Sequence, residues 1–195
     1  MSALFDLKIP IFWDEGQPEI NYKSFKFSVS GLVGNSHTYY TDELYNLSKD
    51  KISARLTSVT RWSVRLEWEG ISGINFLKIA EPLPEALYVK FVSYGEKYFT
   101  VVPLDALKAS HSLIATRANG EALPVEYGGP VRALFPQLWG YKSAKSIVKA
   151  EFVKDYCKGY WESRGYSDSA DIQKTKIYDI NTKTTKFHTG GEVEW

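Results

Sequence analysis

Cysteine is almost absent from this chain of 195 residues, and its three histidines lie too far apart in sequence to form a metal-binding pair. The lone Cys157 excludes an intramolecular disulfide and a cysteine-rich zinc site. No run of about 18 apolar residues exists, so the sequence predicts no membrane-spanning helix. The first residues also lack the basic and apolar regions of a secretory signal, which favours a cytoplasmic location.

The chain also has no large excess of positive or negative charge. The chain has 24 Lys and Arg against 23 Asp and Glu, so its composition gives no reason to expect nucleic-acid binding. Aromatic residues, in contrast, make up 15% of the chain, and the apolar content of 44% is typical of a globular protein. We expect a single domain over 1–195, with an N-terminal arm over 1–20, a core over 21–166 and a C-terminal extension over 167–195.

Short stretches of alternating apolar residues predict strands rather than long helices. Ser72 is expected to cap one of the short helices. In the strand predicted over 52–60, Ser58 falls on the apolar face, where its hydroxyl needs a partner. Further strands or hairpins are predicted over 25–33, 87–102, 113–117 and 177–187. The predicted fold class is therefore α+β, mostly β, with short helices between the strands.

One compact basic cluster offers chemistry. Arg132 lies in a segment broken by glycine and proline, and the run Lys142-Ser143-Ala144-Lys145 follows ten to thirteen residues later. A glycine-rich loop lets backbone N–H groups approach an anion, and guanidinium, ammonium and hydroxyl groups add directed donors. A phosphate site is one interpretation. A solvated basic edge, paired with nearby glutamates, is the other and is favoured when spacing alone is considered.

Aromatic residues gather close to this cluster in the sequence. They are Trp139, Tyr141, Tyr160, Trp161 and Tyr166. Composition favours the interpretation that they form ordinary core. They would equally form the walls of a pocket for a flat heterocycle.

Four stretches carry a resemblance to a known family. They read TSVTRWS at 57–63, GEALPVEYGGPVR at 120–132, GYKSAK at 140–145 and GYWESRGY at 159–166. Together they resemble the sulfite oxidase-type molybdopterin-binding domain, a family that includes sulfite oxidases, plant nitrate reductase and the bacterial methionine sulfoxide reductase catalytic subunit. The resemblance covers about residues 20–166 and implies the sulfite oxidase molybdopterin-binding-domain fold.

The resemblance also implies roles for single residues. Arg132, Ser143 and Lys145 match positions that hold the pterin and its phosphate. Tyr166 matches the tyrosine of the substrate pocket, and Arg61 is expected to orient a substrate with it. The full set of residues implied to bind the cofactor is Ser93, Tyr127, Arg132, Lys142, Ser143, Ala144 and Lys145.

Two positions depart from the family pattern. Ser58 stands where the family has the cysteine whose thiolate binds molybdenum, and Tyr127 stands where it has histidine or asparagine. A serine hydroxyl is far less acidic than a thiol and is a harder, weaker ligand for a thiophilic metal.

These departures leave three hypotheses open. The first is a molybdenum–molybdopterin oxidoreductase that transfers oxygen atoms, with Ser58 at the metal, a small oxo substrate and a separate electron-transfer protein. The second is a domain that binds molybdopterin or only an anion without turnover. The third is a protein-interaction domain that keeps the fold and has lost the metal centre.

Overall fold

Alternation of apolar and polar residues creates a five-stranded sheet with one buried face. In the computed structural model, which describes residues 3–195, its strands follow the order β2 (His37–Tyr40), β1 (Lys26–Gly31), β10 (Ile147–Val153), β5 (Tyr88–Ser93) and β6 (Phe99–Pro103). Strand β1 pairs in parallel with β10, and the other neighbours are antiparallel. The β5–β6 hairpin confirms the prediction for 87–102.

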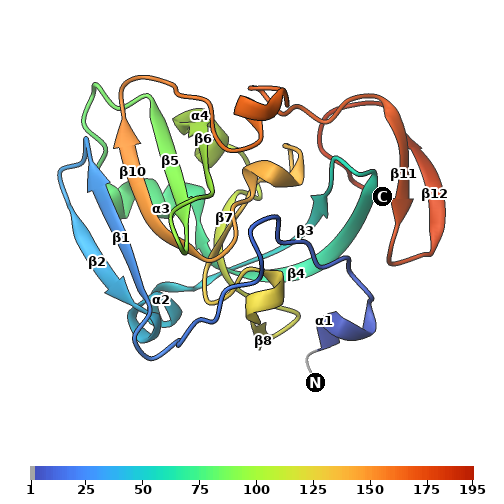
Figure 1. Ribbon diagram of the computed structural model, residues 1–195, viewed down its shortest axis with the longest axis horizontal. Helices are drawn as coiled ribbons and strands as arrows, with labels where there is room; N and C mark the ends of the chain where they lie inside the picture. Colours follow the sequence, from blue (N-terminus) through green and yellow to red (C-terminus); the bar gives the residue numbers. More distant parts are fainter. Residues whose placement is uncertain (1–2) are drawn as a thin grey trace.

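The second sheet has seven strands and is built around a long central strand. Its members are β3 (Asp50–Thr57), β4 (Trp62–Ser72), β7 (Leu113–Ala118), β8 (Glu121–Ala122), β9 (Arg132–Leu134), β11 (Thr175–Asp179) and β12 (Thr184–His188). Strand β3 pairs with one edge of β4, while β11 and β7 pair with the start and the end of its other edge. The strands β8 and β9 extend the sheet beyond β7. Strand β12 extends it beyond β11 (Figure 1).

The helices are short and connect strands. They are α1 (Ala3–Asp6), α2 (Thr41–Leu47), α3 (Gly73–Ala80) and α4 (Leu104–Lys108), with 3₁₀ turns at 125–127, 140–142 and 162–164. The Ser72 hydroxyl accepts a hydrogen bond from the Asn75 N–H at 3.4 Å, which confirms the predicted cap of α3. Strands hold 38% of the residues and helices 17%, which confirms the mostly-β class. Among the described residues, no helix is long and apolar enough to cross a membrane.

Two apolar cores lie on opposite faces of the second sheet. The larger core joins β1, β5, β10, α3 and β7 and includes Phe27, Phe91, Phe152, Phe76 and Ile114. The smaller core contains the other face of β7, together with β3, β4 and the N-terminal residues Leu4 and Ile9. Burying each large apolar side chain contributes about 1.5–3 kcal/mol, so these cores hold the sheets in place around the loops that join them.

The N-terminal segment crosses the molecule in front of both sheets (Figure 1). It starts with the one-turn helix α1, which departs from the arm without regular elements that we predicted over 1–20. Buried Ile9 fixes the segment at one end, and the Tyr22 hydroxyl donates to the Leu123 carbonyl at 2.6 Å near the other end. Residues 10–19 between these anchors are termed the strap.

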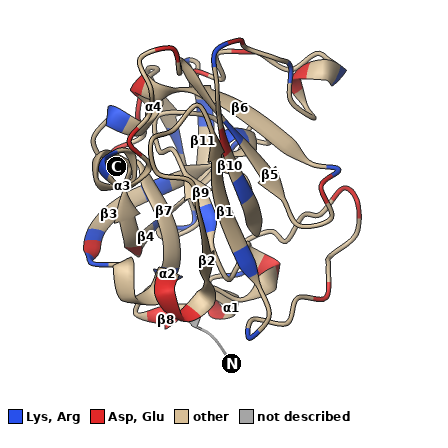
Figure 2. Cartoon of the chain, turned by 90° about the vertical axis from the view of Figure 1, so that its left-hand side faces the viewer, with Lys and Arg blue, Asp and Glu red and all other residues tan. Residues whose placement is uncertain are grey.

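The C-terminal extension is part of the second sheet. Strands β11 and β12 form the hairpin predicted over 177–187, and β11 pairs in parallel with the start of β4. Asp179 is fully buried and accepts a hydrogen bond from the Arg55 guanidinium of β3 at 3.0 Å. Lys and Arg are interspersed with Asp and Glu along the ribbon in Figure 2, in line with the net charge of +1.

Candidate functional site

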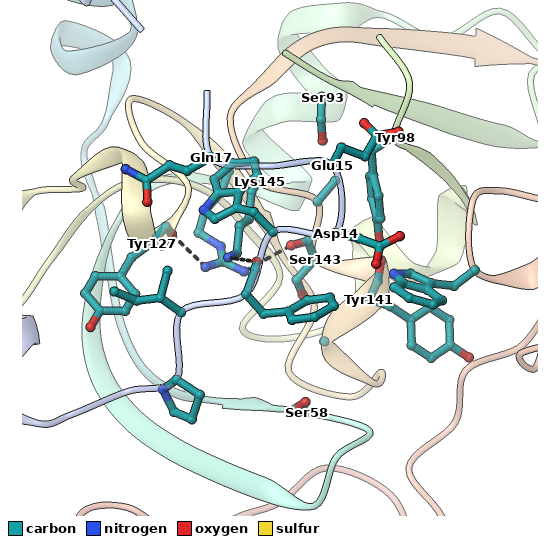
Figure 3. A pocket seen from close by; sticks show the side chains of 18 of the residues that line it. Asp14, Glu15, Gln17, Ser58, Ser93, Tyr98, Tyr127, Tyr141, Ser143 and Lys145 are labelled. Carbon is teal, nitrogen blue, oxygen red and sulfur yellow. Dashed lines mark hydrogen bonds between the residues drawn. The ribbon is translucent and has the colours of Figure 1, made fainter. Parts of the chain in front are cut away.

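A cavity of about 640 Å³ is bordered by the strap and by loops of both sheets (Figure 3). Its other walls come from the turn at 58–62, the β5–β6 turn at 93–98, the loop at 127–145 and the aromatic residues Trp161 and Tyr166. A volume of this size is within the range of small-molecule and cofactor sites, about 300–1,000 Å³. We call it the central cavity.

Two consecutive glycines let the 127–145 loop close on itself at the wall of the cavity. Gly128 has a φ of +95°, and a Cβ at this position would lie only 2.9 Å from Cγ of Lys145. At Gly129 a Cβ would lie 1.8 Å from the carbonyl oxygen of Leu123. Any larger residue would push the loop away from its neighbours, so the glycines are required for this close approach.

Arg132, at the start of β9, presents a buried guanidinium to the cavity. Only 2% of the residue is exposed. The guanidinium donates to the carbonyl oxygens of Tyr127 at 2.8 Å, Ser143 at 3.0 Å and Ala133 at 3.4 Å. A guanidinium has five N–H donors. Two of them therefore have no acceptor among residues 3–195.

The charge of Arg132 is not neutralised by a carboxylate. None of the ion pairs within the described part of the chain includes it. Burial lowers the pKa of this guanidinium to about 10, because removal from water disfavours the charged form. The guanidinium still carries its positive charge at neutral pH, and it faces the central cavity.

Lys145 adds a second positive charge on the same side. Its Nζ donates to the carbonyl oxygen of Phe12 at 2.7 Å and of Glu126 at 3.4 Å, and it lies 4.6 Å from the centre of the Trp13 ring. Burial, with a further contribution from the charge of Arg132, lowers the pKa of Lys145 to about 7. The ammonium has three N–H donors, so one remains without an acceptor in residues 3–195.

Serine hydroxyls complete this side of the cavity. The Ser143 Oγ accepts a hydrogen bond from the Phe135 N–H at 3.0 Å, which leaves its own hydrogen available. Ser93 is 2% exposed and borders the cavity, and its hydroxyl has no partner among the described residues. The Ala144 N–H already donates to the carbonyl of Lys142 at 3.1 Å. Arg132, Ser143 and Lys145 are termed the basic cradle.

Lys142 does not border the cavity, contrary to the contact predicted for it. Its ammonium is 1% exposed and forms a buried ion pair with Glu162, and it also donates to the carbonyl of Val101 at 2.9 Å. The Thr100 hydroxyl donates to the same Glu162 carboxylate at 3.0 Å. The Lys142 side chain is therefore held inside the protein by Glu162 and Val101, whereas the neighbouring Ser143 borders the cavity.

Ser58 lies at the cavity but not on a strand. Strand β3 ends at Thr57, and residues 58–61 form the hairpin turn to β4, closed by a hydrogen bond from the Arg61 N–H to the Ser58 carbonyl at 2.9 Å. The prediction of a strand through Thr60 is therefore wrong. The Ser58 hydroxyl lies 2.8 Å from the Thr60 hydroxyl and accepts from the Thr60 N–H at 3.2 Å. The hydrogen-bonding capacity of this hydroxyl is therefore satisfied locally, by Thr60 in the same turn.

Of the two residues predicted to face a substrate, Arg61 and Tyr166, only Tyr166 borders the cavity. Arg61 is exposed in the turn with a φ of 69°, and it does not border the cavity. Tyr166 does border it and stacks on Trp161 with ring centres 5.0 Å apart. Tyr141 packs edge-on against Tyr166 at 5.2 Å. Three of the five clustered aromatic residues, Tyr141, Trp161 and Tyr166, thus form a wall of the cavity and also pack in or against the core.

Tyr127 contributes to the site mainly through its backbone carbonyl rather than through its ring. Its carbonyl accepts from Arg132, while its hydroxyl donates to the carbonyl of Ile9 at 3.2 Å. The ring packs against Phe5 at 5.3 Å in the smaller core. The ring of Tyr127 therefore anchors the N-terminal segment and does not fill the cavity.

Sequence reasoning missed the strap as part of the site. Phe12 and Trp13 contact Lys145, and the Tyr160 hydroxyl donates to Asp14. In Figure 3, Asp14 and Glu15 lie near Ser143 and Lys145, whereas Ser58 lies apart from them. The only signal in the sequence was an aromatic and acidic run between two prolines, and it does not reveal which loop it crosses.

Comparison with known proteins identifies the family. The profile of the family described as "Oxidoreductase molybdopterin binding domain" matches residues 15–161, well over half of the chain. The chain belongs to this family. The resemblance drawn from the four sequence stretches is therefore confirmed.

Relatives within the molybdopterin-binding family differ in length. The chain is 33% identical over 149 residues to the uncharacterized oxidoreductase YuiH of Bacillus subtilis, covering 75% of this chain and 74% of that protein. It is 27% identical over 164 residues to the protein-methionine-sulfoxide reductase catalytic subunit MsrP of Campylobacter jejuni, covering 76% of this chain and 55% of that protein.

A solved structure confirms the fold. The sulfane dehydrogenase SoxCD from Paracoccus pantotrophus matches with a TM-score of 0.67 at 17% identity, covering 90% of this chain and 47% of that chain. At this identity the likeness concerns the fold alone. The chain spans only about half the length of SoxCD and MsrP, so what those whole proteins do does not transfer to it directly.

Proposed function

We propose that this protein binds a molybdenum–molybdopterin cofactor in the central cavity and acts as an oxidoreductase that transfers oxygen atoms. One observation carries the proposal: the basic cradle places two cationic groups at the cavity, Arg132 and, below about pH 7, Lys145, with no carboxylate partner in the described chain. A buried charge without a partner costs several kcal/mol. An anionic ligand such as a phosphate removes this cost.

The residues present fit a pterin phosphate. Two free N–H groups of Arg132, one of Lys145 and the Ser143 hydroxyl are directed donors, and a hydrogen bond to a charged partner contributes about 1.5–3 kcal/mol. Ser93 supplies a further hydroxyl from the end of β5. The stacked Trp161 and Tyr166 form an apolar wall suited to a flat heterocycle.

A bound molybdenum centre would supply two-electron oxygen-atom exchange, chemistry that protein side chains do not perform. Around it, the chain itself would hold the pterin, shield the cavity from water through its aromatic wall, and leave room for a small oxo substrate. Tyr166 is the predicted substrate residue that borders the cavity, so we assign substrate orientation to its hydroxyl. We propose that electrons come from a separate protein.

The residue at the metal-ligand position, Ser58, fits a molybdenum cofactor least well. The Ser58 hydroxyl shares hydrogen bonds with Thr60 and is not a thiolate. This observation favours a second candidate function, a domain that retains the pterin without metal turnover. The two candidates agree on the basic cradle and differ only at Ser58.

One experiment tests the proposal and separates the candidates. The chain is produced in a host that makes molybdopterin, and molybdenum and pterin are assayed in the same purified sample. We expect pterin at close to one per chain, lost in Arg132→Ala and Lys145→Ala and retained in Lys158→Ala, a control at an exposed lysine that does not border the cavity. Pterin that is absent from the unaltered protein would refute both candidates.

The metal content then decides between them. Near-stoichiometric molybdenum in the unaltered protein supports the oxidoreductase with Ser58 at the metal. Pterin without molybdenum supports the binding domain, and in that case Ser58→Cys should raise the molybdenum content, because a thiolate is a stronger ligand than a hydroxyl. If Ser58→Cys leaves the content unchanged, more than the ligand is missing.

A further inference from the structure

The strap is held at its two ends by contacts to the rest of the protein, and its middle is mostly exposed. At one end, Ile9 is 6% exposed and its carbonyl accepts from the Tyr127 hydroxyl. At the other, the Tyr22 carbonyl accepts from the Thr41 hydroxyl at 2.7 Å. Most residues from 10 to 19 are exposed in between. A segment fixed at its ends and solvated in its middle can move locally without unfolding the domain.

The middle of the strap contacts the basic cradle directly. The Phe12 carbonyl takes one of the N–H donors of Lys145, and the Trp13 ring lies over the same ammonium. All strap residues from Pro10 to Glu19 border the cavity. An anion that binds Lys145 therefore lies beside the strap and competes with, or shares, the contact to Phe12.

Besides the bond from the Lys145 ammonium to the Phe12 carbonyl, three side-chain hydrogen bonds within the described residues hold the strap over the cavity, and they differ in strength. Trp13 and Gln17 each donate to Glu126 at 3.3 Å, near the long end of the hydrogen-bond range. The third joins the Tyr160 hydroxyl to the Asp14 carboxylate, and this bond raises the pKa of the phenol above its ordinary value. A bond to a charged acceptor is the stronger kind.

We propose that the strap is a gate that controls how fast an anionic ligand enters and leaves the basic cradle, with the hydrogen bond between Tyr160 and Asp14 as its latch. This inference rests on the proposed anion site and adds its regulation. When the latch opens, the strap swings out between its anchors at Ile9 and Tyr22 and uncovers Lys145. Ligand exchange then depends on how often the latch opens.

A gate has a kinetic signature that distinguishes it from a simple contact. If opening precedes both entry and exit, weakening the latch raises the association and dissociation rate constants by the same factor, and the dissociation constant stays the same. If Asp14 or Tyr160 merely contacts the ligand, only the dissociation rate rises and binding weakens. The ratio of the two rate constants separates these cases.

The test uses Tyr160→Phe, which removes the latch without changing any charge. Its matched control is Tyr156→Phe, because the Tyr156 hydroxyl donates to Asp168 at 2.9 Å in a similar exposed pair away from the cavity. Full-length protein from a host that lacks the pterin pathway is mixed with inorganic phosphate in a stopped-flow instrument at pH 6. Intrinsic tryptophan fluorescence reports binding, because Trp13, Trp62 and Trp161 border the cavity.

We expect Tyr160→Phe to raise both rate constants about fivefold, with a dissociation constant within twofold of the unaltered protein, and Tyr156→Phe to change neither rate. Unchanged rates in Tyr160→Phe, or a rise in dissociation alone, would overturn the gate and leave the anion site standing. If the unaltered protein shows no saturable phosphate binding that depends on Lys145, the proposed function fails and the gate fails with it.

Discussion

Buried cations in this protein are compensated in two different ways. Lys142 and Arg55 each lie against a buried carboxylate, that of Glu162 and Asp179 respectively. Arg132 is as deeply buried, but its guanidinium donates to carbonyl oxygens and lies 5.8 Å from the Trp68 ring, with no carboxylate partner among residues 3–195. The first two cations are neutralised within the protein, whereas the third is not.

The difference separates structural charges from ligand-binding charges. Burial raises the pKa of Asp179, but hydrogen bonds from Thr182, Lys186 and Arg55 outweigh it and hold that pKa well below its usual range. Burial also lowers the pKa of both arginines, because removal from water disfavours the charged form, but at Arg55 the hydrogen bond and charge of Asp179 act against it, whereas no carboxylate does so at Arg132 within residues 3–195. Both kinds of cation look alike in the sequence. Only the presence or absence of a neighbouring carboxylate in the structure shows which cation stabilises the fold and which is available to bind an anion.

The largest expected effect comes from breaking a neutralised pair. Glu162→Ala leaves Lys142 buried without a carboxylate, and we expect a loss of about 3–5 kcal/mol in the free energy of unfolding. Urea unfolding followed by circular dichroism measures it. Asp105→Ala, which breaks the exposed pair with Lys108, should cost less than about 1 kcal/mol. Equal losses in both variants would contradict the comparison.

Breaking the basic cradle should affect binding more than folding. Arg132→Ala and Lys145→Ala each remove charged hydrogen-bond donors, so we expect phosphate to bind about ten- to hundredfold more weakly. Isothermal titration calorimetry at constant ionic strength measures the affinity. Lys97→Ala, an exposed lysine at the same cavity, serves as the charge control and should change it less than about threefold. An unchanged affinity in both cradle variants would make these charges structural.

The pH dependence of anion binding sharpens the contrast between the two cradle cations. Lys145, with its pKa lowered to about 7, is protonated below that pH and neutral above it, whereas Arg132 stays charged to about pH 10. We expect sulfate, whose charge is constant from pH 5 to 9, to bind with full affinity below pH 7. Its affinity should fall by up to about tenfold per pH unit above pH 7.

The control for this pH profile replaces Lys145 by a permanently charged residue. Lys145→Arg should bind sulfate almost independently of pH over the same range, because arginine does not titrate there. Calorimetric titrations at half-unit steps are sufficient. A fall of the same size in Lys145→Arg would assign the titration to another group.

The smallest effect is expected from a neutral wall residue. Tyr166→Phe keeps the ring that stacks on Trp161 and removes only a hydroxyl. Phosphate affinity should change less than about twofold, and the free energy of unfolding less than about 0.5 kcal/mol. Isothermal titration calorimetry measures the phosphate affinity, and urea unfolding measures the free energy of unfolding. A loss comparable to that of Arg132→Ala would place the anion at Tyr166 rather than in the basic cradle.

Local patterns predicted the elements well and their ends less well. The alternation in β1 and the turn residues at 94–96 predicted a strand and a hairpin that the structure confirms, because alternation and turn chemistry act over a few residues. Ser58 was placed on a strand because it continued the alternation of β3. The hydrogen bonds across the 58–61 turn ended that strand three residues earlier.

The site was predicted only as far as single segments allow. Arg132, Ser143 and Lys145 were brought together as expected, since one loop carries all three. Lys142 belongs to the same loop, but its ammonium pairs with Glu162, a residue 20 positions further along the chain. The strap residue Phe12 was missed, because its contact with Lys145 joins positions 133 residues apart.

By itself, the sequence determined the mostly-β class, the family and the basic run that forms the cradle. These properties follow from residue type and short spacing, which the chain retains in any conformation. The tertiary structure decided which cations are neutralised and which segment covers the cavity. Those outcomes depend on distances between segments far apart in the chain, and only the packing of two sheets around a common core sets such distances.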